Sequence, residues 1–175
     1  MKTLFKIYLV SNELSSNSQQ AITLAKNKKL GEIKNKKVIY SVYEAFYLIE
    51  NNKAELVYKN KTISKNKTLK ILSKKDKEFT TNYLVYKDLR KKALIPKTGL
   101  KFGAEFRIYF SPKNPKDSLT HAEYLSLITT SKQKLNLKEF IAKNRVAHST
   151  AKKLLIAIVD SQQDITYYEV NWKKL

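Results

Sequence analysis

The sequence predicts an α+β protein with two domains, a small N-terminal α/β domain over residues 1–78 and a C-terminal α/β domain over residues 82–175. Two observations support this fold class. Hydrophobic residues make up 42% of the 175 residues, which is enough for one core or two small ones. Strand-like and helix-like segments alternate along the second half, and this alternation favours an α/β domain over an all-β one.

The N-terminal half contains two predicted strands, residues 3–10 (TLFKIYLV) and 54–58 (AELVY). Ser18 is a predicted N-cap for a short helix over residues 18–26. The clearest helix covers residues 41–51, because its apolar residues recur at positions i, i+3, i+4 and i+7 of one helix face. The polar, Lys-rich stretch from residue 59 to 77 is expected to be a loop with one weak helix.

The C-terminal half carries more predicted elements. Helices are expected over residues 81–92 and 135–148. The predicted strands are residues 94–97, 105–110, 122–129, 153–159 and 165–170. Pro96, Gly99 and Gly103 mark turns, and residues 160–164 form a predicted hairpin turn between the last two strands.

The charge of the chain indicates its class of partner. The sequence holds 35 Lys and Arg against 15 Asp and Glu, a net charge of +20, and only three of the cations are Arg. A natural partner for such a chain is a polyanion, either nucleic acid or an anionic membrane face. The charge alone does not separate binding from catalysis.

Several function classes are excluded by residues that are missing. The absence of Cys rules out disulfides, Cys-ligated zinc and thiol catalysis. Three glycines are too few for a phosphate-binding or dinucleotide-binding loop. No apolar run approaches the roughly 20 residues of a membrane helix, and the N-terminus does not resemble a signal peptide, so we expect a cytoplasmic protein without a membrane partner.

Metal-dependent cleavage has weak support in the sequence. Glu32 and Lys34 have the Glu-x-Lys spacing found in some metal-dependent nucleases, but no Asp precedes Asp76. His121 and His148 have no ligand spacing with a carboxylate. We therefore expect neither a metal nor another cofactor.

RNA cleavage without a metal remains open, because RNA carries its own nucleophile in the ribose 2′-OH. Such an enzyme needs a base, an acid and a cation for the phosphate charge. His121 follows a loop and precedes a strand, Tyr109 lies in the preceding strand, and Lys152 heads the apolar strand at 153–159. From these residues alone, the chain is either an RNA-binding or an RNA-cleaving protein.

Several blocks of the second half resemble one known family. They are residues 83–90 (YLVYKDLR), 97–109 (KTGLKFGAEFRIY), 121–125 (HAEYL), 145–149 (RVAHS) and 152–160 (KKLLIAIVD). In this order and spacing they are similar to the archaeal tRNA-splicing endonucleases, from about Tyr83 to Trp172. In the first half, only residues 41–49 (SVYEAFYLI) resemble that family. The resemblance implies a nuclease domain with a mixed sheet flanked by helices.

The resemblance also implies an activity and its residues. Tyr109 would be the general base toward the 2′-OH, His121 the general acid for the 5′ oxygen, and Lys152 the cation beside the phosphate. The implied substrate is precursor tRNA with a bulge-helix-bulge at its exon–intron junctions, and the implied products carry 2′,3′-cyclic phosphate and 5′-hydroxyl ends. Two alternatives remain. One is a non-catalytic structural subunit or RNA-binding protein of the same assembly, and the other is a metal-dependent DNA nuclease.

Further residues are implied to bind RNA or a neighbouring subunit. Arg145 and Trp172 would stack on a bulged base. Asp160 and Asp164 would dock in a basic groove of a neighbouring subunit, and the strand at 165–170 is a candidate for pairing across an interface. The implied assembly is a homotetramer or a heterotetramer with a structural subunit.

Overall fold

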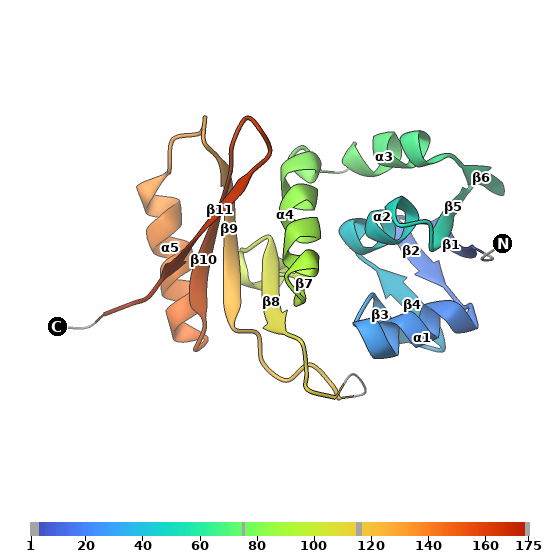
Figure 1. The fold of residues 1–175 in the computed structure, drawn as a ribbon, viewed down its shortest axis with the longest axis horizontal. Helices are drawn as coiled ribbons and strands as arrows, with labels where there is room; N and C mark the ends of the chain where they lie inside the picture. The colour runs from blue at the N-terminus through green and yellow to red at the C-terminus, as the bar shows by residue number, and fades with distance from the viewer. Residues whose placement is uncertain (1–3, 75, 115–116, 174–175) are drawn as a thin grey trace. The chain divides into compact units, whose positions relative to one another are not determined.

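The computed structural model describes residues 4–74, 76–114 and 117–173. The chain divides near Phe79 into two compact units, which are described separately. Each unit has its own sheet, as Figure 1 shows. No helix in the described ranges is both long and apolar enough to cross a membrane.

The N-terminal unit is built on a six-stranded sheet in the order β3-β4-β2-β1-β5-β6. Its strands are β1 (Phe5–Val10), β2 (Glu13–Ser16), β3 (Glu32–Lys34), β4 (Lys37–Tyr40), β5 (Ala54–Tyr58) and β6 (Lys61–Ile63). β1 and β5 run parallel and the other neighbours run antiparallel. The helices are α1 (Gln19–Lys28), α2 (Val42–Glu50) and α3 (Lys65–Ser73).

The predicted helix signals of this unit are confirmed. Ser18 caps α1 by accepting a hydrogen bond from the Ala21 amide. Ser41 and Glu44 form a capping box at the start of α2, in which each side chain accepts a hydrogen bond from the other residue's amide. The buried Glu44 carboxylate also accepts from the Gly31 amide at 2.9 Å, so the cap ties the helix to the turn before β3.

Four strands of this unit were not predicted. They are β2, β3, β4 and β6, and they belong to hairpins whose two-residue turns contain no glycine. Both turn residues are left-handed at Ser11–Asn12, Asn35–Lys36 and Lys59–Asn60. Such turns require positive φ at both central positions, and asparagine adopts this conformation more readily than most residues. The stretch expected to be a loop with a weak helix thus contains β6 and α3, which Ser64 caps.

The C-terminal unit has a five-stranded sheet in the order β11-β10-β9-β8-β7. Its strands are β7 (Leu94–Thr98), β8 (Phe106–Phe110), β9 (Tyr124–Thr130), β10 (Lys153–Val159) and β11 (Ile165–Val170). Only β9 and β10 run parallel, so the sheet is mixed. Its helices are α4 (Phe79–Lys91) and α5 (Leu137–Ser149), with a short 3₁₀ turn, η1 (Leu100–Phe102).

The two helices cover opposite faces of this sheet (Figure 1). On the α5 face, Ala147 packs in one cluster with Leu125, Leu127, Leu154 and Ile156. On the α4 face, the ring of Tyr86 lies 5.9 Å from that of Phe106. The predicted α+β fold class is therefore confirmed, and β10 and β11 have the predicted bounds.

Candidate active site

The register of three strands brings the candidate catalytic segments together at one edge of the C-terminal sheet. This edge is formed by the ends of β8, β9 and β10, not by an outer strand. Ile108 pairs with Tyr124 across the antiparallel β8–β9 pair, and Lys153 pairs with the same Tyr124 across the parallel β9–β10 pair. Backbone hydrogen bonds continue the pairing by one residue. The Glu123 amide donates to the Ile108 carbonyl, and the Glu123 carbonyl accepts from the Lys153 amide. The end of β8 and the starts of β9 and β10 therefore meet.

Tyr109 and His121 line the same cavity, of about 310 Å³, at this edge. Tyr109 is only 9% exposed, and it packs with Ile95 and Ala122. His121 is exposed, on the segment that leads into β9. The cavity thus brings together two side chains that can exchange protons, a phenol and an imidazole.

Lys152 and Lys153 lie on opposite faces of the sheet. Leu154 pairs with Leu125, which pairs with Arg107, whereas Lys153 pairs with Tyr124. Paired residues share a face of the sheet, and so do residues two apart on a strand. Lys152 therefore lies on the same face as Leu154, and this is also the face of Arg107 and Tyr109. Lys152 Nζ lies there, 5.3 Å from the centre of the Phe102 ring, and donates to the Thr150 carbonyl at 2.7 Å.

The two lysines also differ in their charge partners. Lys153 pairs with Glu169 at 3.2 Å and with Glu123 at 3.6 Å. Its hydrogen bond with Glu169 raises the pKa of Lys153, and hydrogen bonds from Asn171, Tyr124 and Lys153 lower the pKa of Glu169. In the part of the chain that the structure describes, no carboxylate pairs with Lys152. Its positive charge is therefore available to a phosphate.

Trp172 lies beside the same edge of the sheet, but its ring partner is His148. The two rings are stacked with centres 5.3 Å apart and an interplanar angle of 19°. Both residues line a second cavity, of about 360 Å³, together with Lys152. In the sequence, His148 was considered only as a metal ligand and set aside for lack of ligand spacing, although it stands in the same block as Arg145.

Arg145 is exposed on α5, three residues before His148. The structure brings Trp172, His148 and Lys152 together around one cavity, whereas Arg145 is not among the residues that line it. Residues three apart on a helix are neighbours on its surface. Arg145 therefore lies on the part of α5 next to this cavity.

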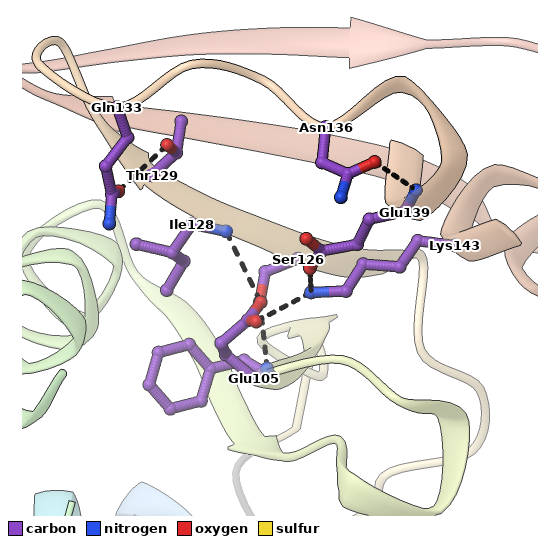
Figure 2. A network of polar contacts seen from close by, with 9 residues as sticks. Glu105, Ser126, Ile128, Thr129, Gln133, Asn136, Glu139 and Lys143 are labelled. Atoms are coloured by element: carbon purple, nitrogen blue, oxygen red, sulfur yellow. Dashed lines mark hydrogen bonds and ion pairs between the residues drawn. The ribbon is translucent and has the colours of Figure 1, made fainter. Parts of the chain in front are cut away.

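A polar network fastens α5 to the sheet (Figure 2). The Glu105 carboxylate, which precedes β8, accepts hydrogen bonds from Ser126 and the Ile128 amide in β9 and from Lys143 in α5 at 2.7 Å. Lys143 also pairs with Glu139 at 3.1 Å. The side chains of Lys143 and Glu105 are only 12% and 24% exposed, so the pair holds the helix that carries Arg145 and His148.

One of the two aspartates in the turn after β10 accepts hydrogen bonds from backbone amides of that same turn. Asp160 accepts hydrogen bonds from the amides of Gln162 and Asp164 at 2.8 and 2.9 Å. The strand that follows, β11, is an outer strand of the sheet, paired on one side only. Its Tyr167 donates to Asp88 of α4, while Tyr168 is 55% exposed. Burial and Asp88 both raise the pKa of the Tyr167 hydroxyl.

The Glu-x-Lys spacing at Glu32 lies in an exposed strand, β3, of the N-terminal unit. There Glu32 forms an ion pair with Lys34 at 3.1 Å. Over the described ranges, no three His, Asp or Glu side chains cluster as metal ligands would.

Comparisons with known proteins agree with the resemblance seen in the sequence blocks. Residues 79–167 match the family described as tRNA intron endonuclease, catalytic C-terminal domain. The chain is 35% identical to the tRNA-splicing endonuclease of Pyrococcus furiosus over 175 residues, which cover 99% of both chains. It is 39% identical to that of Methanothermobacter thermautotrophicus over 132 residues, 75% of each chain. With that of Nanoarchaeum equitans, identity is 38% over 135 residues, 75% of this chain and 86% of that protein.

Replacing Lys143 by Met should destabilise the C-terminal unit by about 2 kcal/mol, because the Glu105 carboxylate would remain half-buried without its cation. Replacing Lys92, which is 53% exposed and pairs with Asp88, by Met should cost less than about 1 kcal/mol. Chemical denaturation of the two variants measures both values. In a double-mutant cycle, adding Glu105→Gln to Lys143→Met should recover part of the loss. Equal costs at the two lysines would contradict a fastening role for the Glu105–Lys143 pair.

Proposed function

Because this chain belongs to the tRNA-splicing endonuclease family, we propose that Tyr109, His121 and Lys152 carry out the cleavage. The chain is an endonuclease that cleaves introns from precursor tRNA, since it contains the catalytic domain and matches its relatives over nearly their whole length. The observation that carries the residue assignment is the shared cavity of Tyr109 and His121, at the sheet edge where Lys152 also lies.

The proposed reaction needs two proton transfers around one phosphorus atom. Tyr109 accepts the proton of the ribose 2′-OH, and the freed oxygen attacks the adjacent phosphorus. The bond from phosphorus to the 5′ oxygen breaks as His121 donates a proton to that oxygen. The products are a 2′,3′-cyclic phosphate and a 5′-hydroxyl end. No water, metal or oxidant enters this balance, because the RNA supplies the nucleophile.

Lys152 is the proposed cation for the non-bridging phosphate oxygens. The negative charge on these oxygens grows as the 2′ oxygen attacks, so a fixed cation stabilises the transition state more than the substrate. Two features of Lys152 support the assignment. It lies on the sheet face of Tyr109, and no described carboxylate neutralises it, unlike Lys153.

Arg145 and Trp172 are the proposed contacts for a bulged base. A guanidinium plane and an indole both stack on bases, and an unpaired base is already out of its helix. Trp172 is 47% exposed beside the cavity of Lys152, and Arg145 is exposed on the neighbouring surface of α5. As the only tryptophan of the chain, Trp172 is a direct fluorescent reporter of this contact.

We propose that the substrate junction is a bulge-helix-bulge and that a two-fold symmetric assembly cuts both of its ends. Two cuts at a fixed separation require two active sites at a fixed separation, which symmetry provides. The exposed edge strand β11 and the turn at Asp160 and Asp164 are the proposed subunit contacts. Asp164 is the better candidate of the two, since Asp160 already accepts hydrogen bonds within its turn.

The proposed domain boundaries are those expected from the sequence, residues 1–78 for the N-terminal domain and 82–175 for the catalytic domain. We further propose that the protein works in the cytoplasm, together with its precursor tRNA. The match to the family's catalytic domain argues against the alternative that the sequence left open, a purely structural, non-cleaving role within the same assembly. The co-occurrence of all three catalytic groups at one sheet edge favours the enzyme.

Replacing His121 by Ala should lower the rate of cleavage roughly 10²–10⁴-fold, because the leaving oxygen would lose its acid. Affinity for a bulge-helix-bulge RNA with 2′-deoxyribose at the cut site should change little, because this RNA can bind but not react. The measurement is single-turnover cleavage in EDTA, with mapping of the product ends. Cleavage that required Mg²⁺ would indicate the metal-dependent alternative. If neither protein cleaves, even with the other subunit added, the chain is a structural subunit.

Lys152 and Lys153 provide a matched pair of substitutions. Each change to Gln removes one positive charge from adjacent residues on opposite sheet faces. Lys152→Gln should slow the cleavage step by about 10²-fold or more, as expected for a lost transition-state cation. Lys153→Gln should retain cleavage within a few-fold, and similar losses in both variants would argue against a specific role for Lys152.

The mass of the protein in solution tests the proposed assembly. A homotetramer should appear at about four times the 20.3 kDa of one chain and should cleave RNA without a partner. A heterotetramer would instead require the second subunit for activity. Substituting Tyr168 in β11 by Asp should shift the mass toward smaller species, and an unchanged mass would place the interface elsewhere.

A further inference from the structure

We propose that Arg107 is a second phosphate-binding cation of this site, acting with Lys152 on the phosphate that is cut. The inference rests on the roles proposed above for Tyr109 and Lys152. Arg107, which was not among the predicted site residues, is the second residue of β8 and stands two residues before Tyr109.

Arg107 lies between the proposed base and the proposed cation. Its guanidinium carbon is 5.9 Å from the centre of the Tyr109 ring and 5.8 Å from the centre of the Phe102 ring. Lys152 Nζ lies 5.3 Å from the centre of that same Phe102 ring. The four side chains therefore form a continuous row, in the order Tyr109, Arg107, Phe102 and Lys152.

The chemistry requires the substrate to bridge the ends of this row. The 2′-OH must reach Tyr109, and the non-bridging oxygens of the next phosphate must reach Lys152. These two groups belong to the same nucleotide linkage, so the phosphate bound between them passes over Arg107 and Phe102. A cation at this position contacts the atom group on which negative charge accumulates.

The guanidinium of Arg107 is suited to this contact and is not already neutralised. Its Nε donates to the Thr98 carbonyl at 3.0 Å, which fixes the plane of the group. Among the described residues, this is its one hydrogen bond, and no carboxylate pairs with it. Nearby Glu105 is bound to Lys143 instead. The two terminal nitrogens can therefore donate to two phosphate oxygens, the bidentate geometry that arginine favours.

Phe102 is an uncharged neighbour that the two cations share. An aromatic ring attracts a cation toward its face, and this ring has Arg107 and Lys152 as neighbours. Each cation therefore lies against the ring, which does not neutralise its charge. Their placement in advance of binding is what makes the pair effective in the transition state.

The experiment compares Arg107→Gln with Lys101→Gln. Lys101 is an exposed neighbour of Phe102, so both changes remove one positive charge from the same region. Arg107→Gln should lower the single-turnover cleavage rate roughly 10²–10³-fold, while Lys101→Gln stays within a few-fold of the unaltered protein. Affinity for the 2′-deoxy RNA should fall far less than the rate. An unchanged cleavage rate in Arg107→Gln would overturn the inference.

A second measurement separates phosphate contact from a purely structural role. Sulfur accepts hydrogen bonds more weakly than oxygen, so a phosphorothioate at the cut site should slow the unaltered protein for the isomer whose sulfur faces Arg107. In Arg107→Gln this slowing should disappear, whereas a variant that is merely less stable would keep it. A thio effect of the same size in both proteins would overturn phosphate contact, whatever the melting temperatures are.

Tyr109→Phe and Lys152→Gln distinguish failure of this inference from failure of the proposed function. If both lose cleavage while Arg107→Gln does not, only the role of Arg107 is overturned. If both cleave at the unaltered rate, the proposed catalytic residues are wrong and the inference falls with them.

Discussion

The parallel pairing of β9 with β10 is the constraint on which the candidate site depends. Parallel strands begin at the same edge of a sheet, so the segments before β9 and β10 are brought together although about thirty residues separate them. The antiparallel pairing of β8 with β9 adds the end of β8 to this edge. His121, Lys152 and Tyr109 thus come from three separate stretches of chain. The connecting helix α5 must pack back on the sheet for the pairing to form, and the Glu105–Lys143 pair holds it there.

A net charge of +20 describes the partner class, but the local charge balance identifies the cations that can act on a phosphate. Lys153 and Lys143 are each held by two carboxylates. Lys152 and Arg107 instead lie against one aromatic ring, and no described carboxylate pairs with them. An aromatic ring orients a cation without cancelling its charge. The structural cations and the proposed phosphate-binding ones therefore differ in their immediate neighbours.

The N-terminal unit was the harder half to predict, for a reason visible in its hairpins. Two-residue hairpin turns are usually recognised by glycine, and here Ser11–Asn12, Asn35–Lys36 and Lys59–Asn60 take its place. The short strands beside these turns include β3 and β6, whose residues are mostly exposed. They carry little of the alternating apolar pattern by which strands are recognised. Two helices of the same unit were predictable, α1 from its N-cap Ser18 and α2 from the periodic spacing of its apolar residues.

By itself, the sequence determined the fold class, the strands and helices of the catalytic unit to within a few residues, the opposite facing of Lys152 and Lys153, and the family. Local patterns of spacing, capping and order suffice for these. Only the tertiary structure decided which side chains meet. It placed Tyr109 and His121 on one cavity, gave Trp172 the ring of His148 as its partner, and set Arg107 between Tyr109 and Phe102. These contacts join residues from different strands and loops, so they depend on register and packing, which no local pattern encodes.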